Sequence, residues 1–158
     1  MLAHLKGERM FYVCEFEFFD DEEGGVTAFC LNEWGGATFG DSLEDAVESA
    51  ADWLASMIDD ALLNDKQLPP ISFGHEPAHN GQVIAVAVTR DLSDIKSMSA
   101  ADAARTLGVS RARITQLIQA GLLDSWKEGH HCRVTVDSVN ARLNDLRKPD
   151  APAQVAQA

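Results

Sequence analysis

Residues 10–19, which read MFYVCEFEFF, are mostly aromatic or branched, and apolar and polar side chains alternate within them over 14–18. A period of two, with many aromatic and branched residues, predicts a β-strand that buries one face. The face predicted to be buried carries Tyr12, Cys14, Phe16 and Phe18. Glu15 and Glu17 lie on the other face of the same strand.

An acidic run, DDEEG at residues 20–24, predicts a turn after this strand. Residues 25–31 then predict the strand that returns beside it. If the hairpin is symmetric about Glu22, Cys14 and Cys30 lie opposite each other. We interpret the two cysteines as a small apolar cross-strand pair in preference to a redox site.

A loop at residues 32–36 that displays Trp34 comes next, followed by a short third strand at 37–40. Helical periodicity follows, with a capping pattern of Ser42 and Asp45 at its start. The apolar stripe of this long helix consists of Leu43, Ala46, Val47, Ala50, Trp53, Leu54, Met57, Ile58 and Ala61.

Pro69 and Pro70 are expected to end the long helix. An irregular loop at 71–80 and a buried strand at 82–89 (QVIAVAVT) complete the first part of the chain. The pattern predicts a β-β-β-α-β domain over residues 1–90, with one helix on one sheet.

Two short helices are predicted after a polar linker at residues 91–97. Ser99 and Asp102 form a capping pattern before the first helix, and Gly108 ends it. Ser110 caps the second, which runs from 111 to about 120 and ends at Gly121. Two helices joined by a short turn that contains glycine are typical of a helix-turn-helix.

A small hairpin and a third helix complete the second predicted domain, residues 98–148. Strands at 125–128 and 132–136 flank Gly129–His130–His131, and Asp137 is expected to cap a helix that bears Val139, Leu143 and Leu146. Residues 149–158 lack a packing pattern and are expected to be a disordered tail. The fold class predicted for the whole chain is α+β, with a winged helix-turn-helix as its second domain.

The net charge of −12 divides unevenly along the chain. Residues 1–96 hold 5 Lys/Arg against 19 Asp/Glu, which gives −14, and residues 97–148 hold 8 against 5, which gives +3. Such asymmetry suggests two parts with different partners. The basic part suits phosphate, whereas the acidic part suits a basic protein.

Several classes of protein are excluded by composition. No apolar run approaches the length of a membrane span, and the first ten residues lack the apolar centre of a signal peptide. The three cysteines show no C-x-x-C spacing, so we expect neither a disulfide framework nor a zinc site. A cytoplasmic protein without a cofactor or membrane partner is expected.

Helix-turn-helix docking places the start of the second helix at base edges in the major groove. The DNA-binding residues predicted there are Ser110, Arg111, Arg113, Thr115 and Gln116. Arginine pairs bidentately with guanine, and glutamine pairs with adenine. The hairpin is predicted to add Lys127, His130, His131 and Arg133 near the backbone or the minor groove. Adjacent strand residues point to opposite faces, so we do not expect His130 and His131 to share a metal.

The acidic residues of the first domain invite comparison with a two-metal nuclease. Only Glu15 and Glu17 share a strand face, and residues 25–31 contribute no carboxylate. We therefore expect a binding role and no enzyme activity. The residues predicted to contact a basic partner are Asp20, Asp21, Glu22, Glu23 and Trp34, with Phe73 as a further exposed anchor.

Two resemblances cover nearly the whole chain. The aromatic strand, the acidic turn, residues 35–60 (GGATFGDSLEDAVESAADWLASMIDD) and residues 68–72 (LPPIS) resemble the HicB antitoxins of toxin–antitoxin systems. Residues 103–111 (AARTLGVSR), residues 118–123 (IQAGLL) and the small wing are similar to the excisionase and MerR-like helix-turn-helix class.

The HicB resemblance implies a degenerate, shortened ribonuclease H-like domain without the catalytic carboxylates. It also implies that the chain blocks a small basic ribonuclease toxin, HicA, and represses its own operon by binding operator DNA. Many HicB proteins end in a ribbon-helix-helix or lambda-repressor-like domain, and this chain departs from that pattern. The alternative is a stand-alone helix-turn-helix regulator or excisionase-like factor whose first domain senses a ligand. A homodimer or higher homo-oligomer is expected, because a single domain with few base contacts binds DNA weakly.

Overall fold

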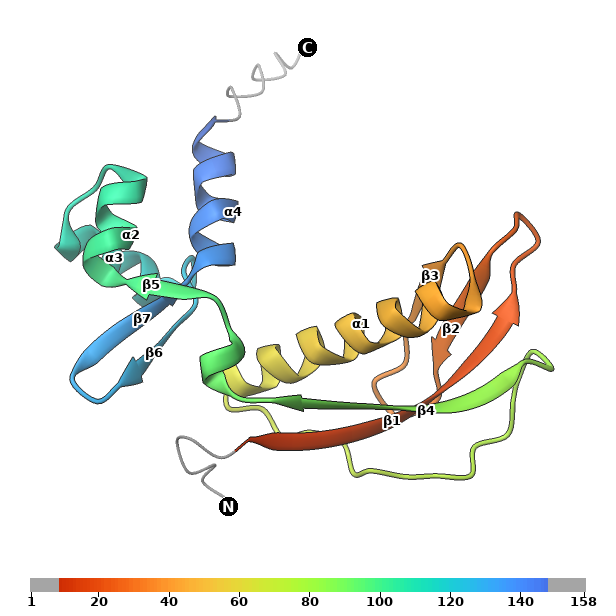
Figure 1. Ribbon diagram of the computed structural model, residues 1–158. Helices are drawn as coiled ribbons and strands as arrows, with labels where there is room; N and C mark the ends of the chain where they lie inside the picture. Colours follow the sequence, from red (N-terminus) through yellow and green to blue (C-terminus); the bar gives the residue numbers. More distant parts are fainter. Residues whose placement is uncertain (1–8, 148–158) are drawn as a thin grey trace, which may run out of the picture. The chain divides into compact units, whose positions relative to one another are not determined.

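Two compact units divide the chain between Asp94 and Ile95 in the computed structural model, which describes residues 9–147. Each unit has its own antiparallel sheet and its own core, and the described residues form four helices in all (Figure 1). The predicted α+β class is confirmed. The predicted tail at 149–158 lies outside the described residues. No helix in the described range is long and apolar enough to cross a membrane.

The N-terminal unit is one helix on a four-stranded sheet. Its elements are β1 (Met10–Asp20), β2 (Val26–Cys30), β3 (Ala37–Gly40), α1 (Leu43–Leu63) and β4 (Gln82–Arg90). The strand order is β3-β2-β1-β4, every neighbouring pair is antiparallel, and α1 covers one face (Figure 1). The predicted β-β-β-α-β order is confirmed.

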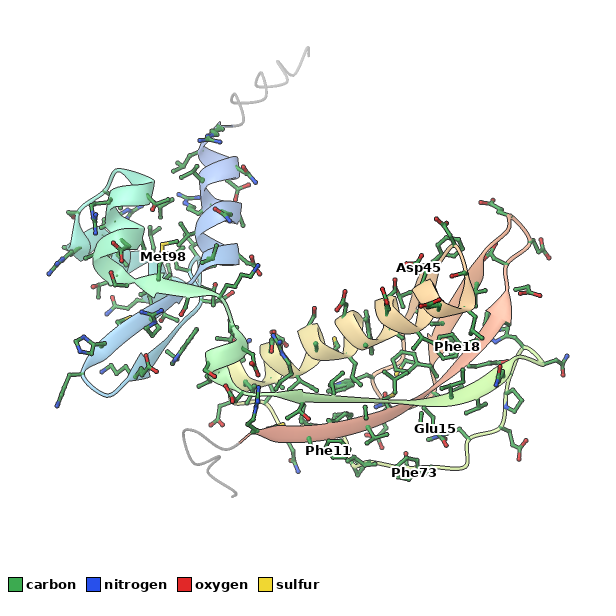
Figure 2. The ribbon with its side chains drawn as sticks, viewed as in Figure 1. Phe11, Glu15, Phe18, Asp45, Phe73 and Met98 are labelled. Atoms are coloured by element: carbon green, nitrogen blue, oxygen red, sulfur yellow. The ribbon has the colours of Figure 1, made fainter. Side chains whose placement is uncertain are left out.

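Alternation along β1 positions the core as the sequence predicted. The strand residues turned to the helix include Tyr12, Cys14, Phe16 and Phe18, each no more than 3% exposed. The helix contributes Ala46, Ala50, Leu54, Ile58 and Ala61. Figure 2 shows Phe18 between α1 and the sheet and Glu15 on the opposite face.

The start of α1 follows the predicted cap. The Ser42 hydroxyl accepts a hydrogen bond from the Asp45 N–H at 3.2 Å, and the Asp45 carboxylate accepts one from the Asp41 N–H at 2.8 Å. Gly40 fits beneath this turn because a Cβ there would lie 2.2 Å from the backbone nitrogen of Ala46.

The end of α1 differs from the expectation. The helix ends at Leu63, well before Pro69, and the Asn64 N–H bonds to the Asp60 carbonyl oxygen at 3.1 Å. The Asn64 side chain also donates to Asp60. A polar residue that bonds its own preceding turn closes the helix before the prolines are reached.

The β1–β2 hairpin has a different register from the predicted one. Asp20 pairs with Val26, which centres the hairpin on Glu23 instead of Glu22, and Cys30 lies opposite Phe16. Cys14 and Cys30 are therefore diagonal neighbours. Their sulfurs still lie 3.3 Å apart in the core, because a shift of two residues keeps both side chains on the same face.

The C-terminal unit combines three helices with a small sheet. Its elements are β5 (Ser97–Ser99), α2 (Ala100–Leu107), α3 (Arg111–Gln119), β6 (Ser125–Glu128), β7 (His131–Thr135) and α4 (Val136–Arg147), and its strand order is β5-β7-β6. The stretch predicted as a linker, 91–97, is partly regular. A short 3₁₀ turn covers Leu92–Asp94, and Ser97 already pairs with Thr135.

The core of the C-terminal unit brings all of its helices together with its sheet. Its buried members are Ala103, Ala104, Leu107, Ile114, Leu117, Leu123, Val134 and Val139. Val136 was predicted as a strand residue but begins α4, and Asp137 does not cap this helix. Thr135 caps it instead, since its hydroxyl accepts a hydrogen bond from the Ser138 N–H at 3.2 Å. Leu146 is 58% exposed and does not belong to the core.

Candidate functional site

Helices α2 and α3 are joined by a short turn at residues 108–110, in which Gly108 ends α2 with a left-handed φ of +66°. The Ser99 hydroxyl accepts a hydrogen bond from the Asp102 N–H at 3.0 Å, and the Ser110 hydroxyl accepts one from the Arg113 N–H at 3.2 Å. The predicted caps at Ser99 and Ser110 are therefore present. At the far end of α3, Gly121 adopts the predicted left-handed conformation, with φ of +69°.

The exposed face of α3 carries the side chains predicted to contact DNA. Ile114 and Leu117 point into the core and are 1% and 3% exposed. The exposed positions are Ser110, Arg111, Ala112, Arg113, Thr115 and Gln116. The helix contains two arginines and no acidic residue, so this face is positively charged. A charged, uncrowded helix face of this kind can bind phosphates or the edges of bases.

Two contacts restrain side chains on this face. The Arg113 guanidinium donates to the Gln116 Oε1 at 3.0 Å, which aligns two groups that can pair with bases. The Thr115 hydroxyl donates to the Arg111 carbonyl oxygen at 3.3 Å. The Arg111 side chain lies at a groove of about 310 Å³ whose other walls include His130 and His131.

The β6–β7 hairpin displays the next group of predicted residues. Glu128 pairs with His131, so Gly129 and His130 form a two-residue loop. Gly129, with φ of +62°, occupies the first loop position, where a type II′ turn requires a positive φ. Lys127, His130 and His131 are exposed, and His131 belongs to β7 instead of the loop.

Arg133 differs from the other predicted residues because its guanidinium is already engaged. It donates to the Ser97 hydroxyl at 3.0 Å and to the Ser97 carbonyl oxygen at 3.1 Å, and Glu128 lies 3.9 Å away. These contacts hold β5 against β7. The structure thus gives Arg133 a supporting role at the edge of the groove.

A single carboxylate stands near the start of α2. The Ser99 hydroxyl bonds to Asp102 and lowers the pKa of that carboxyl, and the guanidinium of Arg105 contributes in the same direction. Asp102 therefore stays ionised and forms an ion pair with Arg105 of the same helix. The positive potential of the α3 face is not opposed by an unpaired carboxylate at this position.

The acidic turn of the N-terminal unit lies at one end of the sheet. Asp20, Glu22 and Glu23 are exposed. Asp21 is partly buried and organises the turn, because it accepts hydrogen bonds from the Glu23 N–H at 2.9 Å and the Thr27 hydroxyl at 3.1 Å. Three of the four predicted acidic contacts are therefore available to a partner.

Trp34 is packed and not freely displayed. Its ring centroid lies 5.1 Å from that of Tyr12 and 6.3 Å from that of Trp53, and the residue is half-buried. The expectation of an exposed Trp34 anchor is wrong, because the loop folds back over the edge of the core. Phe73, in contrast, is 64% exposed.

Glu15 and Glu17, on the outer face of β1, bind the 71–81 loop through their carboxylates, and the sequence did not predict these contacts. We call the two contacts carboxylate clamps. The Glu15 carboxylate accepts hydrogen bonds from the N–H groups of Gly74 and His75 and lies 2.6 Å from the His75 Nδ1. These bonds lower the pKa of Glu15, and the bond from the His75 N–H has the largest effect.

Glu17 forms the second clamp and is fully buried. Its carboxylate accepts hydrogen bonds from the N–H groups of Ala78, His79 and Gly81 at 2.7 to 2.9 Å, and the His79 Nδ1 lies 3.0 Å away. Burial raises the pKa of Glu17, but the bonds from Gly81 and His79 outweigh it and lower the pKa to about 2. The loop 71–81 is thereby fastened to the sheet.

The signal for these clamps was present but ambiguous. Two glutamates on a strand face are usually solvated, and two histidines around Pro77 in a loop suggest no partner by themselves. What could have indicated the contact is the length of the 71–81 loop, which has to cross the sheet to reach β4.

Comparison with known proteins gives no further assignment, since no protein-family model, curated protein or solved structure matches the chain.

Proposed function

We propose that this chain is an antitoxin of the HicB type that blocks a small basic ribonuclease toxin and represses its own operon. In this proposal the N-terminal unit is the degenerate ribonuclease H-like domain, and the C-terminal unit is a winged helix-turn-helix. The observation that carries the proposal is the pairing, in one chain, of an acidic unit with a unit that exposes two arginines on a capped short helix.

The C-terminal unit supports the DNA-binding half. Arg111 and Arg113 are exposed at the start of α3, the position that enters the major groove in helix-turn-helix proteins. Lys127 and His130 on the β6–β7 hairpin are suited to phosphate contacts. Because Arg133 is held by Ser97, we now assign it to positioning the hairpin.

The N-terminal unit supports binding of a basic protein. Its described cations are all paired: Arg9 with Asp94 at 3.0 Å, Lys66 with Asp60 at 2.7 Å and Arg90 with Asp59. An exposed row of carboxylates, Glu44, Glu48 and Asp52, follows one side of α1 at intervals of four residues. Unneutralised acidic surface of this kind steers a basic partner and mainly raises the rate of association.

The Glu15 and Glu17 clamps support a binding role over a nuclease role. A two-metal nuclease needs carboxylates that are open to metal ions. Here both carboxylates are occupied by five backbone N–H groups and two imidazoles from the 71–81 loop. The outer face of β1 is therefore used to build the unit.

A mobility-shift assay with the DNA upstream of the gene tests the regulatory half. Arg111→Ala with Arg113→Ala should abolish the shift. Arg142→Ala with Arg147→Ala, on α4, removes the same charge from the same unit and should leave most of the shift. Equal loss in both double variants would show that only net charge matters and would refute the assignment of α3.

Co-expression with the small protein encoded next to this gene tests the antitoxin half. The chain should relieve growth arrest by that protein and co-purify with it, and the α3 double variant should do both equally well. If the chain neither relieves the growth arrest nor forms a complex, the antitoxin proposal is refuted. An integrase gene in the neighbouring position would favour the excisionase-like alternative.

A further inference from the structure

Strand β4 leaves a row of backbone groups at the free edge of the N-terminal sheet. The Leu31 N–H bonds to the Glu15 carbonyl oxygen at 3.0 Å, so Glu15 directs its backbone groups toward β2. Because backbone groups alternate in direction along a strand, Cys14 and Phe16 direct their N–H and C=O groups toward β4. Their partners Val86 and Ile84 direct theirs toward β1.

The intervening residues of β4 therefore face away from the sheet. These residues are Val83, Ala85, Ala87 and Thr89. In the strand order β3-β2-β1-β4, no described strand lies beyond β4. The edge thus offers four N–H groups and four carbonyl groups over a strand of nine residues.

This edge lacks the devices that normally protect a sheet from pairing with another chain. Protected edges are short, or carry charges, proline or a bulge. The opposite edge, β3, is only four residues long. In contrast, β4 pairs with β1 through nine consecutive positions without a bulge, and residues 82–89 (QVIAVAVT) contain no charge and no proline. This uncharged stretch contrasts with the net charge of −14 over residues 1–96.

The side chains of β4 are nearly symmetric about Val86. Ala85 and Ala87 flank it, and the next pairs outward are Ile84 with Val88 and Val83 with Thr89. An antiparallel two-fold pairing centred on Val86 places each residue opposite a residue of similar size. Val86 faces its own copy, and Ala85 faces Ala87 of the second copy.

Hydrogen bonding agrees with this register. Ala85 and Ala87 both direct their backbone groups outward, so they form hydrogen-bonded pairs across the two-fold axis, and so do Val83 and Thr89. All eight groups at the edge are then satisfied. Gln82 falls opposite Arg90 of the second copy, and Arg90 is already paired with Asp59. No like charges are brought together along the strand.

Apolar side chains near this edge add surface for the same contact. Ala85 and Ala87 are exposed on the face away from α1. Phe11, opposite Thr89 in the register, is 62% exposed. Figure 2 shows Phe11 and Phe73 on the same side of the sheet.

We infer that β4 pairs antiparallel with β4 of a second copy of this chain and joins two four-stranded sheets into one of eight strands. A strand of a basic partner fits this edge less well than a second copy does. The edge offers no carboxylate to a basic strand, and a strand of different sequence would not match the symmetric order of side chains about Val86. The inference does not depend on the antitoxin proposal.

Two double variants with substitutions at the same positions test this interface in the full chain. Ala85→Lys with Ala87→Lys places lysine opposite lysine in the pairing described and should halve the mass measured by light scattering. Ala85→Glu with Ala87→Lys places glutamate opposite lysine across the axis and should keep the wild-type mass. Both positions are exposed, so circular dichroism and the melting temperature should show that each variant folds.

Amide hydrogen exchange of the wild-type chain gives an independent reading. The N–H groups of Ala85 and Ala87 should be protected at concentrations where the assembly forms and should lose protection in the double-lysine variant. A wild-type mass of 17.2 kDa, that of one chain, would overturn the inference. An unchanged mass in the double-lysine variant would also overturn the inference. It would do so even if that variant lost its binding to a basic partner.

Discussion

Replacing Glu17 with glutamine should destabilise the N-terminal unit strongly. The carboxylate is fully buried and accepts three backbone N–H bonds and one from an imidazole, and its pKa is lowered from 4.5 to about 2. At 1.36 kcal/mol per pKa unit, this difference corresponds to about 3 kcal/mol. Glutamine loses the charge and turns an NH₂ group toward donors, so the cost at pH 7 should be at least about 3 kcal/mol.

Urea unfolding followed by circular dichroism measures this cost, with Glu22→Gln in the exposed turn as the matched control. With an m value of about 1.5 kcal/mol/M, Glu17→Gln should lower the midpoint of the N-terminal transition by about 2 M. Glu22→Gln should change the free energy of unfolding by less than about 0.5 kcal/mol. The amides of His79 and Gly81 should also lose protection from hydrogen exchange in Glu17→Gln.

The pH dependence of the same difference checks its cause. Because the folded-state pKa of Glu17 is lowered, its stabilisation is fully present above the unfolded value of 4.5 and is lost as the pH falls toward about 2. The gap between wild type and Glu17→Gln should therefore close over this range. A gap below about 0.5 kcal/mol at pH 7, or a gap independent of pH, would refute the proposed clamp.

Three further predictions concern packing, capping and charge. Gly40→Ala should lower the free energy of unfolding by about 3 kcal/mol, because the added Cβ would lie 2.2 Å from the backbone nitrogen of Ala46. Thermal unfolding measures this change, and an unchanged stability would contradict the close approach. Thr135→Ala should cost about 1 kcal/mol and more than Asp137→Ala, since Thr135 caps α4; the reverse order would restore Asp137 as the cap. For DNA, the plot of log K against log salt should be less steep in Arg111→Ala with Arg113→Ala by a slope of up to about 2, and an unchanged slope would show that neither arginine reaches phosphate.

Local patterns were sufficient to predict the elements of both units. The alternation in β1, the stripe of α1 and the serine caps of α1, α2 and α3 depend on neighbours within a few residues, and the structure agrees with them except at Leu43, the first residue of the stripe, which is 41% exposed. The order of elements then limited the first unit to one helix on one sheet. For the same reason, the side chains exposed at the start of α3 could be listed from the sequence.

Features that depend on distant residues were not predictable. The burial of Glu17 requires N–H groups from a loop sixty residues away, and nothing near Glu17 indicates them. The packing of Trp34 depends on Tyr12 and Trp53. The hairpin register depended on the turn geometry, because shifts by two residues leave the buried face unchanged.

Direct measurement of toxin inhibition tests the central claim. The small basic protein encoded beside this gene would be purified and its cleavage of messenger RNA followed with increasing amounts of the full chain. The account predicts that cleavage stops near stoichiometric addition, equally for wild type and for Arg111→Ala with Arg113→Ala. A neighbouring protein that does not cleave RNA, or cleavage that continues undiminished in excess chain, would contradict it.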